Sequence, residues 1–462
     1  MAIPKSIGEY FEEKDIECQI IELPESMDIQ QTAWHLRDKS ANLVRTVALK
    51  GAAKTVLAVL PYQHLLDIKM ISDQMQDEFN VMDDEQTAKI FDSCSETSFP
   101  PLPGRFDVHF VVDSSVLELP ELYMESGNPN AIIQLDKASI EKVFKDCEVK
   151  DFASTPERLY AGRNADAGKY ELDVSFTPIR LKQRIDDTFD LPAMPEIAQD
   201  IMKLRVDPSA DANRLAQIVC RDPSLAAQVI SWASSPYYGY QGKVDSVETA
   251  IARVLGFELV MNLALGISIG KSLKVPMDGP LGIRQFWRQA IYSANLAEKL
   301  CRAMPVKQRP ERGLIYLSGL LHNFGHLLLG HIFPPQFKLI NDTIQANPHI
   351  AVEDIEFYIL GVTHEEIGAW LMNNWHMPDE LIVAVRRHHQ EEFWSKHAVY
   401  SNIVLVTNRM LKRLDIGDSV ETAVPQSTLE LLSLDEPTVE MVLEDIQSES
   451  ETLDVMAKQL VA

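Results

Sequence analysis

The first third of the chain alternates short apolar runs with amphipathic stretches. Four runs have the texture of β-strands: VRTVAL from Val44, TVLAVLP from Thr55, FDVHFVVD from Phe106 and NAIIQLD from Asn130. The residues between them have helical spacing. We therefore predict an α/β domain over residues 1–150.

One stretch of this domain is incompatible with both an α-helix and a central β-strand. Residues 98–105 read SFPPLPGR, and three prolines with a glycine exclude helix or central strand. We expect an ordered surface loop that could face a ligand. Periodicity fades from about residue 148, and we predict a linker over 151–186.

From residue 187 onward the pattern is helical, with readable start and stop signals. Asp222 can cap a helix that begins with Pro223. Asp245 with Glu248 resembles a capping box, and we expect Gly256 to end that helix. Further helices are predicted at residues 286–302, 313–322, 352–358, 364–375, 379–389 and 401–414. An all-α domain over 187–462 follows.

The last segment, residues 415–462, combines acidity with helical faces. It holds twelve Asp and Glu residues against Lys458 alone, while apolar residues recur at helical spacing. We predict a packed acidic helical cap over the helical core.

Composition narrows the class of partner. Of 462 residues, 46% are hydrophobic and 24% charged, as in globular proteins, and 43 basic against 68 acidic residues give a net charge of −25. Such a field repels DNA and anionic lipid. Five isolated cysteines, without a C-x-x-C pair, suit a reducing compartment, and we expect no leader peptide or membrane-spanning helix. We expect a cytoplasmic protein with no membrane or DNA partner.

Nine of the twelve histidines fall between His322 and His397. A metal centre in a helical bundle would use such imidazoles together with carboxylates that neutralise the cation. The question is whether the carboxylates are present.

Five segments, in this order, resemble the HDOD family over roughly residues 187–462. They read LPAMPEIAQDIMKL, IVCRDPSLAAQVISWASSPYYG, AIARVLGFE, LSGLLHNFGHLLL and THEEIGAWLMNNWHMPDELIVAVRRHH. The resemblance implies an all-α bundle related to HD-type metal-dependent phosphohydrolases. It also implies a regulatory module of a kind that has commonly lost its catalytic metal ligands.

Three positions depart from the phosphohydrolase pattern that the resemblance implies. Gln289 replaces a histidine, and Asn323 and Asn408 replace aspartates. An amide keeps an oxygen but loses the charge that bridges two cations or activates a bound water, so we expect no hydrolysis by the usual route. The potential ligands that remain are His322, His364, His388 and His389.

We expect no cofactor at this degenerate HD site. The favoured interpretation makes His322, His364 and His388 hydrogen-bonded core residues, with His389 turned outward. The alternative is that the four histidines hold a single adventitious divalent metal.

The N-terminal segments VRTVALKG, TSFPPLPGRFDVHFVVD and ESGNPNAIIQLD resemble the YbaK/prolyl-tRNA-editing family. That family removes wrongly attached amino acids from tRNA, and its principal functional lysine corresponds to Arg45. The guanidinium of arginine is planar and permanently charged, whereas the pKa of a lysine ammonium shifts readily with its surroundings. Residues 1–150 hold 14 basic and 27 acidic residues, without a basic stripe for tRNA. Arg45 and Gly104 are the candidate pocket residues, and we expect small-molecule sensing or scaffolding in preference to deacylation.

An aromatic cluster follows the Asp222 helix. Trp232, Tyr237 and Tyr238 are candidate partner-binding residues, although packing between helical subdomains is the stronger alternative. The sequence thus predicts a non-catalytic regulatory protein that binds a signalling protein or small ligand. The alternatives are an aminoacyl-tRNA deacylase in the N-terminal domain and a residual HD-type phosphohydrolase.

Overall fold

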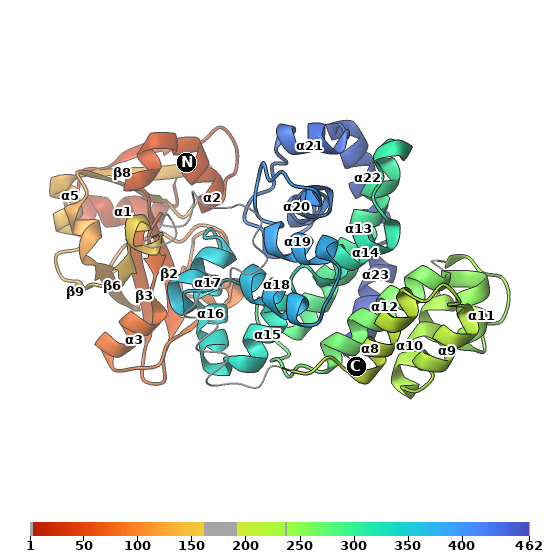
Figure 1. Ribbon diagram of the computed structural model, residues 1–462. Coiled ribbons are helices and arrows are strands. Elements are labelled where there is room, and N and C mark those ends of the chain that lie inside the picture. The colour runs from red at the N-terminus through yellow and green to blue at the C-terminus, as the bar shows by residue number, and fades with distance from the viewer. Residues whose placement is uncertain (1–2, 161–191, 236–237, 462) are drawn as a thin grey trace. The chain divides into compact units, whose positions relative to one another are not determined.

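The computed structural model describes residues 3–160, 192–235 and 238–461, and it divides into two units (Figure 1). The first unit comprises Met1–Gly168 with Leu339–Ile350, and the second comprises Lys169–Lys338 with Ala351–Ala462. The predicted boundary at residue 150 is therefore too early. Strand β10 (Ala153–Ser154) pairs with β4 (Leu65–Leu66), and helix α6 (Pro156–Leu159) follows it. Most of the predicted linker, 161–186, lies outside the described residues.

The first unit is built on mixed sheets, as predicted. The five-stranded sheet has the order β5-β2-β3-β6-β9, in which β2 and β3 are antiparallel while β3, β6 and β9 run parallel. A three-stranded antiparallel sheet has the order β1-β8-β7. The strands are β1 (Gln19–Glu22), β2 (Val44–Lys50), β3 (Thr55–Pro61), β5 (Asn80–Val81), β6 (His109–Asp113), β7 (Glu121–Glu125), β8 (Ala131–Asp136) and β9 (Glu148–Lys150). All four strands expected from the apolar runs are confirmed.

Both faces of β2 are buried, which explains its nearly continuous apolar run. Successive side chains of a strand point to opposite faces. Val44 and Ala48 enter one core, whereas Val47 and Leu49 enter the core on the other face, which also contains Ala346. Arg45 therefore projects on the Val47 side, and Thr46 on the Val44 side.

Aspartates begin most helices of this unit. The side chains of Asp28, Asp67, Asp83 and Asp136 accept hydrogen bonds from backbone N–H groups of the first turns, which lack partners within the helix. The helices are α1 (Lys5–Glu13), α2 (Ile29–Leu36), α3 (Ile68–Met75), α4 (Asp84–Ala88) and α5 (Lys137–Val143).

The second unit is all-helical across its described residues, which confirms the predicted class. Its helices up to the histidine region are α8 (Glu196–Arg205), α9 (Ala212–Val219), α10 (Pro223–Ala233), α11 (Val247–Ala250), α12 (Phe257–Lys271), α13 (Ile283–Ala303), α14 (Arg312–Leu321) and α15 (Phe324–Ile332). Next come α16 (Pro334–Ala346), which crosses into the first unit, and α17 (Val352–Leu360), α18 (His364–Asn374), α19 (Asp379–Arg387) and α20 (Ala398–Lys412).

The predicted helix signals are partly correct. Asp222 caps α10, accepting from the N–H groups of Ser224 and Leu225. The expected capping box at Asp245 is wrong, because Ser246 is the cap and its hydroxyl accepts from the N–H of Thr249. Gly256, with φ of 84°, ends the first stretch as expected, and α12 begins directly after it.

Close packing around α13 forms the centre of this unit. A Cβ on Gly319 of α14 would lie 2.6 Å from the carbonyl oxygen of Ser293 on α13, so only glycine permits this approach. Among the described residues, no helix combines the length and the apolarity needed to cross a membrane.

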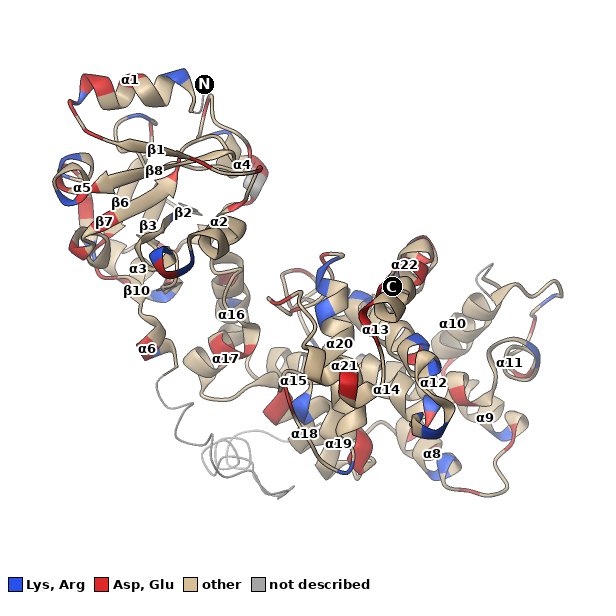
Figure 2. Ribbon diagram, turned by 90° about the horizontal axis from the view of Figure 1, so that it is seen from above, with Lys and Arg blue, Asp and Glu red and all other residues tan. Residues whose placement is uncertain are grey.

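The acidic C-terminal segment is packed, as predicted. It forms α21 (Gln426–Leu432), α22 (Glu436–Ser448) and α23 (Ser450–Val461), and acidic residues mark α22 (Figure 2). Lys299 on α13 pairs with Asp445 and, at 2.8 Å, with Glu449. Leu453 is fully buried. Apolar contacts and ion pairs together attach the segment to α13.

Candidate functional site

Five helices bring the expected HD-type positions to one place in the second unit. Gln289 comes from α13, His322 and Asn323 join α14 to α15, and His364 begins α18. His388 and His389 directly follow α19. The Thr363 capping box fixes the start of α18, and therefore the direction of His364.

His322, His364, His388 and His389 form a histidine cluster. In three of them, Nδ1 is hydrogen-bonded to an oxygen atom at the edge of the cluster. His322 Nδ1 lies 2.8 Å from the Gly319 carbonyl, and His388 Nδ1 lies 2.8 Å from the Val385 carbonyl. His364 Nδ1 lies 2.7 Å from Glu356 Oε2. Because these oxygens only accept, each Nδ1 carries a hydrogen and donates. The Nε2 atoms are left for the centre, which is how proteins orient metal-binding imidazoles.

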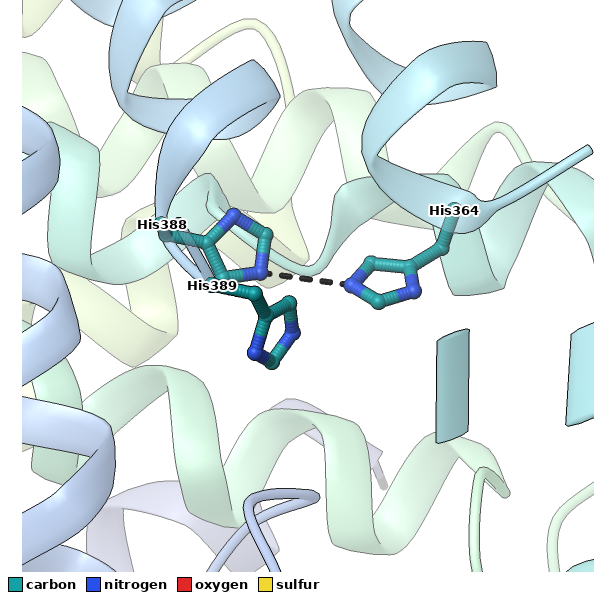
Figure 3. Close-up of side chains that lie close together, drawn as sticks. All are labelled: His364, His388 and His389. Atoms are coloured by element: carbon teal, nitrogen blue, oxygen red, sulfur yellow. Dashed lines mark hydrogen bonds between the residues drawn. The ribbon is translucent and has the colours of Figure 1, made fainter. Parts of the chain in front are cut away.

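His364 and His388 meet through their Nε2 atoms at 3.2 Å (Figure 3). Burial alone lowers the pKa of His364, but the Glu356 carboxylate outweighs it and raises that pKa above its ordinary value. Burial lowers the pKa of His388 well below its ordinary value. These opposite directions favour His364 as the hydrogen-bond donor and His388 as the acceptor in this pair.

His389 faces the cluster, so the expectation that it turns outward is wrong. Its side chain is 13% exposed, and its Nε2 lies 3.7 Å from Asp418 Oδ2. Burial opposes protonation, yet Glu353 and Asp418 raise the pKa of His389 to about 10. The ion pair with Asp418 holds the ring inward.

Asp418 supplies the carboxylate that the expected positions lack. Its Oδ1 accepts from Gln289 Nε2 at 2.8 Å, and its Oδ2 accepts from Asn323 Nδ2 at 2.9 Å. Asn323 Nδ2 also donates to Gln289 Oε1 at 3.0 Å. The two amides that replace metal ligands are thus hydrogen-bonded to each other and to this carboxylate.

Asn408 does not join this network. It is 3% exposed, and neither atom of its amide has a hydrogen-bond partner among the described residues. It lines a cavity of about 50 Å³ together with His388, His389 and Glu421. That volume holds a water molecule or two.

The donor set fits one cation. Ligand atoms of His364, His388 and His389 lie within 4.8 Å of one another, as do those of His326, His364 and Asp418. Imidazoles with one carboxylate suit a single zinc-like ion. A bridged pair of cations does not fit, because Asn323 presents an N–H to Asp418 where a second anionic oxygen would be needed.

Three residues beside the histidine cluster were not among the predicted ligands. Glu356 on α17 is fully buried between His364 and His326, whose Nε2 lies 3.2 Å from Glu356 Oε1. Asp418 directly follows Gly417 in the sequence. Gly417 has φ of 96°, and a Cβ there would lie 2.7 Å from Gln289 Nε2. Only glycine lets this loop reach the site.

In the first unit, Arg45 and Gly104 do not share a pocket. Arg45 donates to Ala346 O at 2.6 Å and Asn347 Oδ1 at 2.5 Å. The proline loop belongs to the opposite face of β2, where Thr46 Oγ1 donates to Phe99 O at 3.0 Å. A Cβ on Gly104 would meet Lys14 Nζ at 3.5 Å. Strand alternation separates the two predicted pocket residues.

Trp232, one of the candidate partner-binding residues, is 1% exposed and packed within the second unit. Tyr238 is half-buried, and Tyr237 lies outside the described residues. Burial of the indole ring favours the packing interpretation for Trp232.

Comparison with known proteins gives two family matches. The HDOD domain matches residues 191–391, and the aminoacyl-tRNA editing domain matches residues 24–143. A crystal structure from Marinobacter aquaeolei VT8, described as a signal transduction protein, is 30% identical, with a TM-score of 0.80 and coverage of 100% of both chains.

Two further relatives match the chain in part. An HDOD domain protein of unknown function from Geobacter sulfurreducens is 20% identical, with a TM-score of 0.50 over 60% of this chain and 96% of its own, and shows a shared fold. An uncharacterised protein of Treponema pallidum (strain Nichols) is 25% identical over 253 residues. That match covers 54% of this chain and 47% of the Treponema protein, so the chain spans about half of that relative.

Proposed function

Because this chain belongs to the HDOD family and carries an aminoacyl-tRNA editing domain before its HDOD domain, we propose that it is a non-catalytic regulatory protein that acts by binding a protein partner or a small ligand. The description of the Marinobacter relative as a signal transduction protein supports a regulatory role. The proposal depends on the chemistry of the degenerate HD site.

One observation carries it: the amide of Asn323 donates to both Gln289 and Asp418, at 3.0 and 2.9 Å. Metal-dependent phosphoester hydrolysis needs anionic ligands that bridge cations and help a bound water to lose its proton. Here the only carboxylate of this network already accepts from two amides. Self-contained hydrogen bonding favours a structural role for the site.

The cavity at the degenerate HD site is too small for a nucleotide or a drug-sized ligand, whereas other cavities of the second unit measure about 370–470 Å³. The cavity beside His388 and Asn408 is about 50 Å³. Pockets for nucleotides and drug-sized molecules are several hundred cubic ångströms. A small regulatory ligand would need a site elsewhere or a large rearrangement.

The experiment compares the full-length protein with a variant in which the missing ligands are restored, Gln289→His/Asn323→Asp/Asn408→Asp. Each is purified, its bound metals are measured by elemental analysis, and hydrolysis of bis-p-nitrophenyl phosphate is followed with added Mn²⁺ or Zn²⁺. We expect at most one metal per chain and no turnover in the wild-type protein. Circular dichroism checks that the restored variant is folded. The folded variant should then bind more metal per chain than the wild-type protein.

Two cations per wild-type chain together with metal-dependent turnover would contradict the proposal. So would turnover that disappears in His364→Ala but persists in the matched surface variant His35→Ala, since His35 is exposed in the first unit.

A further inference from the structure

A segment of the HDOD sequence is part of the first unit. Residues Leu339–Ile350 lie inside the HDOD match of 191–391, yet they belong with Met1–Gly168. Ile340 and Asn347 are fully buried, and Ala346 enters the core formed by Val47 and Leu49 of β2. The segment is thus integrated into the editing-type domain.

Asn347 uses the full hydrogen-bonding capacity of its carboxamide. Its Oδ1 accepts from Arg45 Nη2 at 2.5 Å and from the N–H of Leu66 at 2.7 Å. Its Nδ2 donates to the carbonyls of Leu66 at 3.1 Å and Thr343 at 2.7 Å. An amide has two acceptor and two donor positions, and all four are filled. The side chain therefore pairs with the backbone of Leu66 as a neighbouring strand would.

Arg45 binds the end of α16 and the residue after it. Nη1 donates to the Ala346 carbonyl at 2.6 Å, while Nη2 also donates to the His64 carbonyl at 3.2 Å. A cation is favourable at the C-terminal end of a helix. The planar guanidinium spans these acceptors together, which a lysine ammonium on a flexible stem does not reproduce. The presence of arginine at position 45 is explained by this contact.

A second anchor lies two residues further along. The His349 ring packs on Tyr62, with 4.4 Å between centroids and 31° between ring planes. Asn347 and His349 therefore attach the segment at both ends of the link from β3 to β4.

We propose that the pocket around Arg45 is an intramolecular docking site whose occupant is this chain's own segment Leu339–Ile350, with Asn347 bound where an outside ligand would have to bind. Both terminal nitrogens of Arg45 and both backbone groups of Leu66 are engaged by this segment or by His64. The domain recognises a helix end followed by a carboxamide, and it receives them from the HDOD sequence. This inference is independent of the metal chemistry of the histidine cluster.

The test is hydrogen exchange with mass spectrometry on the full-length protein. Asn347→Ala should increase exchange in peptides covering residues 62–68 and 339–350 by at least tenfold, because it removes four bonds at once. Asn374→Ala, at an exposed position on α18, should leave those peptides unchanged. Arg45→Lys should raise exchange in the same two regions by a smaller factor.

The milder variant Asn347→Asp keeps the test informative if Asn347→Ala does not fold. The carboxylate keeps the acceptor for Arg45 and the Leu66 N–H but loses both donors, so its effect should lie between wild type and Asn347→Ala. Unchanged exchange in all three variants would overturn the proposal. Deacylation of mischarged tRNA by the wild-type protein, abolished in Arg45→Ala, would also overturn it, since an occupied pocket could not bind that substrate. Metal content and phosphodiesterase activity report separately on the proposed function.

Discussion

Glu356 and His364 form an ion pair in the interior of the helical unit, with 2.7 Å between Oε2 and Nδ1 and neither side chain exposed. Burial raises the pKa of Glu356, but contacts with His364 and His326 outweigh it and lower that pKa to about 2. The carboxylate is charged at all physiological pH values, and it fixes which nitrogen of His364 faces the cluster.

Replacing this carboxylate should weaken metal binding. We expect Glu356→Gln to lower Zn²⁺ affinity about 10- to 100-fold, because the neutral amide no longer increases the basicity of His364 as the carboxylate does. Isothermal titration with Zn²⁺ measures the change. Glu451→Gln, an exposed site on α23, is the matched control. Equal affinities in the wild type and both variants would show that His364 is not a ligand.

Restoring the aspartate of the HD pattern at position 323 should make the stability of the folded protein depend on a bound cation. Asn323→Asp places a second carboxylate against Asp418, in place of the 2.9 Å hydrogen bond. Without metal we expect a loss of roughly 3–5 kcal/mol, the usual cost of an uncompensated buried charge. Mn²⁺ or Zn²⁺ should recover much of this loss by binding the folded state. Thermal melts with and without metal measure both effects. Asn323→Ala removes the bond without adding charge, so metal should not rescue it.

The helix contact beneath His364 should tolerate no larger residue. A Cβ on Gly325 would lie 1.9 Å from the His364 carbonyl oxygen. We expect Gly325→Ala to lower the melting temperature strongly, with a cost of roughly 1–3 kcal/mol or more from overpacking. Gly8→Ala on α1, where no atom lies within 4 Å, should be neutral or slightly stabilising. Equal melting temperatures for the two variants would contradict the packing described for α15 and α18.

His349 should make the first unit sensitive to acid. Burial and nearby Arg45 lower the pKa of His349 from 6.5 to about 2, while a hydrogen bond with the Tyr62 backbone opposes the shift only weakly. Below pH 6.5, His349 becomes protonated in the unfolded state but stays neutral in the folded state. The stabilising contribution is therefore complete above pH 6.5 and is lost as pH falls toward 2, by at most about 1.4 kcal/mol per pH unit.

We expect His349→Phe, which keeps a ring on Tyr62, to reduce this slope between pH 6 and 5. Urea unfolding followed by exchange labelling of residues 43–66 isolates the first unit from the second. His35→Phe, at an exposed site, should retain the wild-type slope. A slope shared by all three proteins would show that His349 does not titrate with unfolding.

Sequence reasoning succeeded where local patterns determine structure. The run VRTVAL predicts β2 because both its faces enter cores, and the amides at Asn323 and Gln289 are direct substitutions in a recognisable motif. The same reasoning misassigned His389, because the group that holds it inward lies on a distant loop. Asp418 is one of twelve acidic residues in its segment, and only the tertiary path of that loop distinguishes it from the others.

The role of residues 339–350 could not be predicted for a similar reason. The predicted helices do not include α16, and a local pattern does not specify which core receives an apolar helix face. Arg45 was expected to be a pocket residue, and two of its hydrogen-bond partners, Ala346 and Asn347, lie 301 and 302 positions later in the sequence.

The first unit is discontinuous in sequence, so a fragment that ends between the two family matches lacks part of this unit. A fragment that stops at residue 160 would lack Ile340, Ala346 and Asn347, exposing part of its core and leaving Arg45 a cation without acceptors from α16. Conversely, an excised HDOD fragment would carry an apolar helix end with no receiving surface. Separating the two modules at the sequence boundary between them would therefore remove part of the first unit's core.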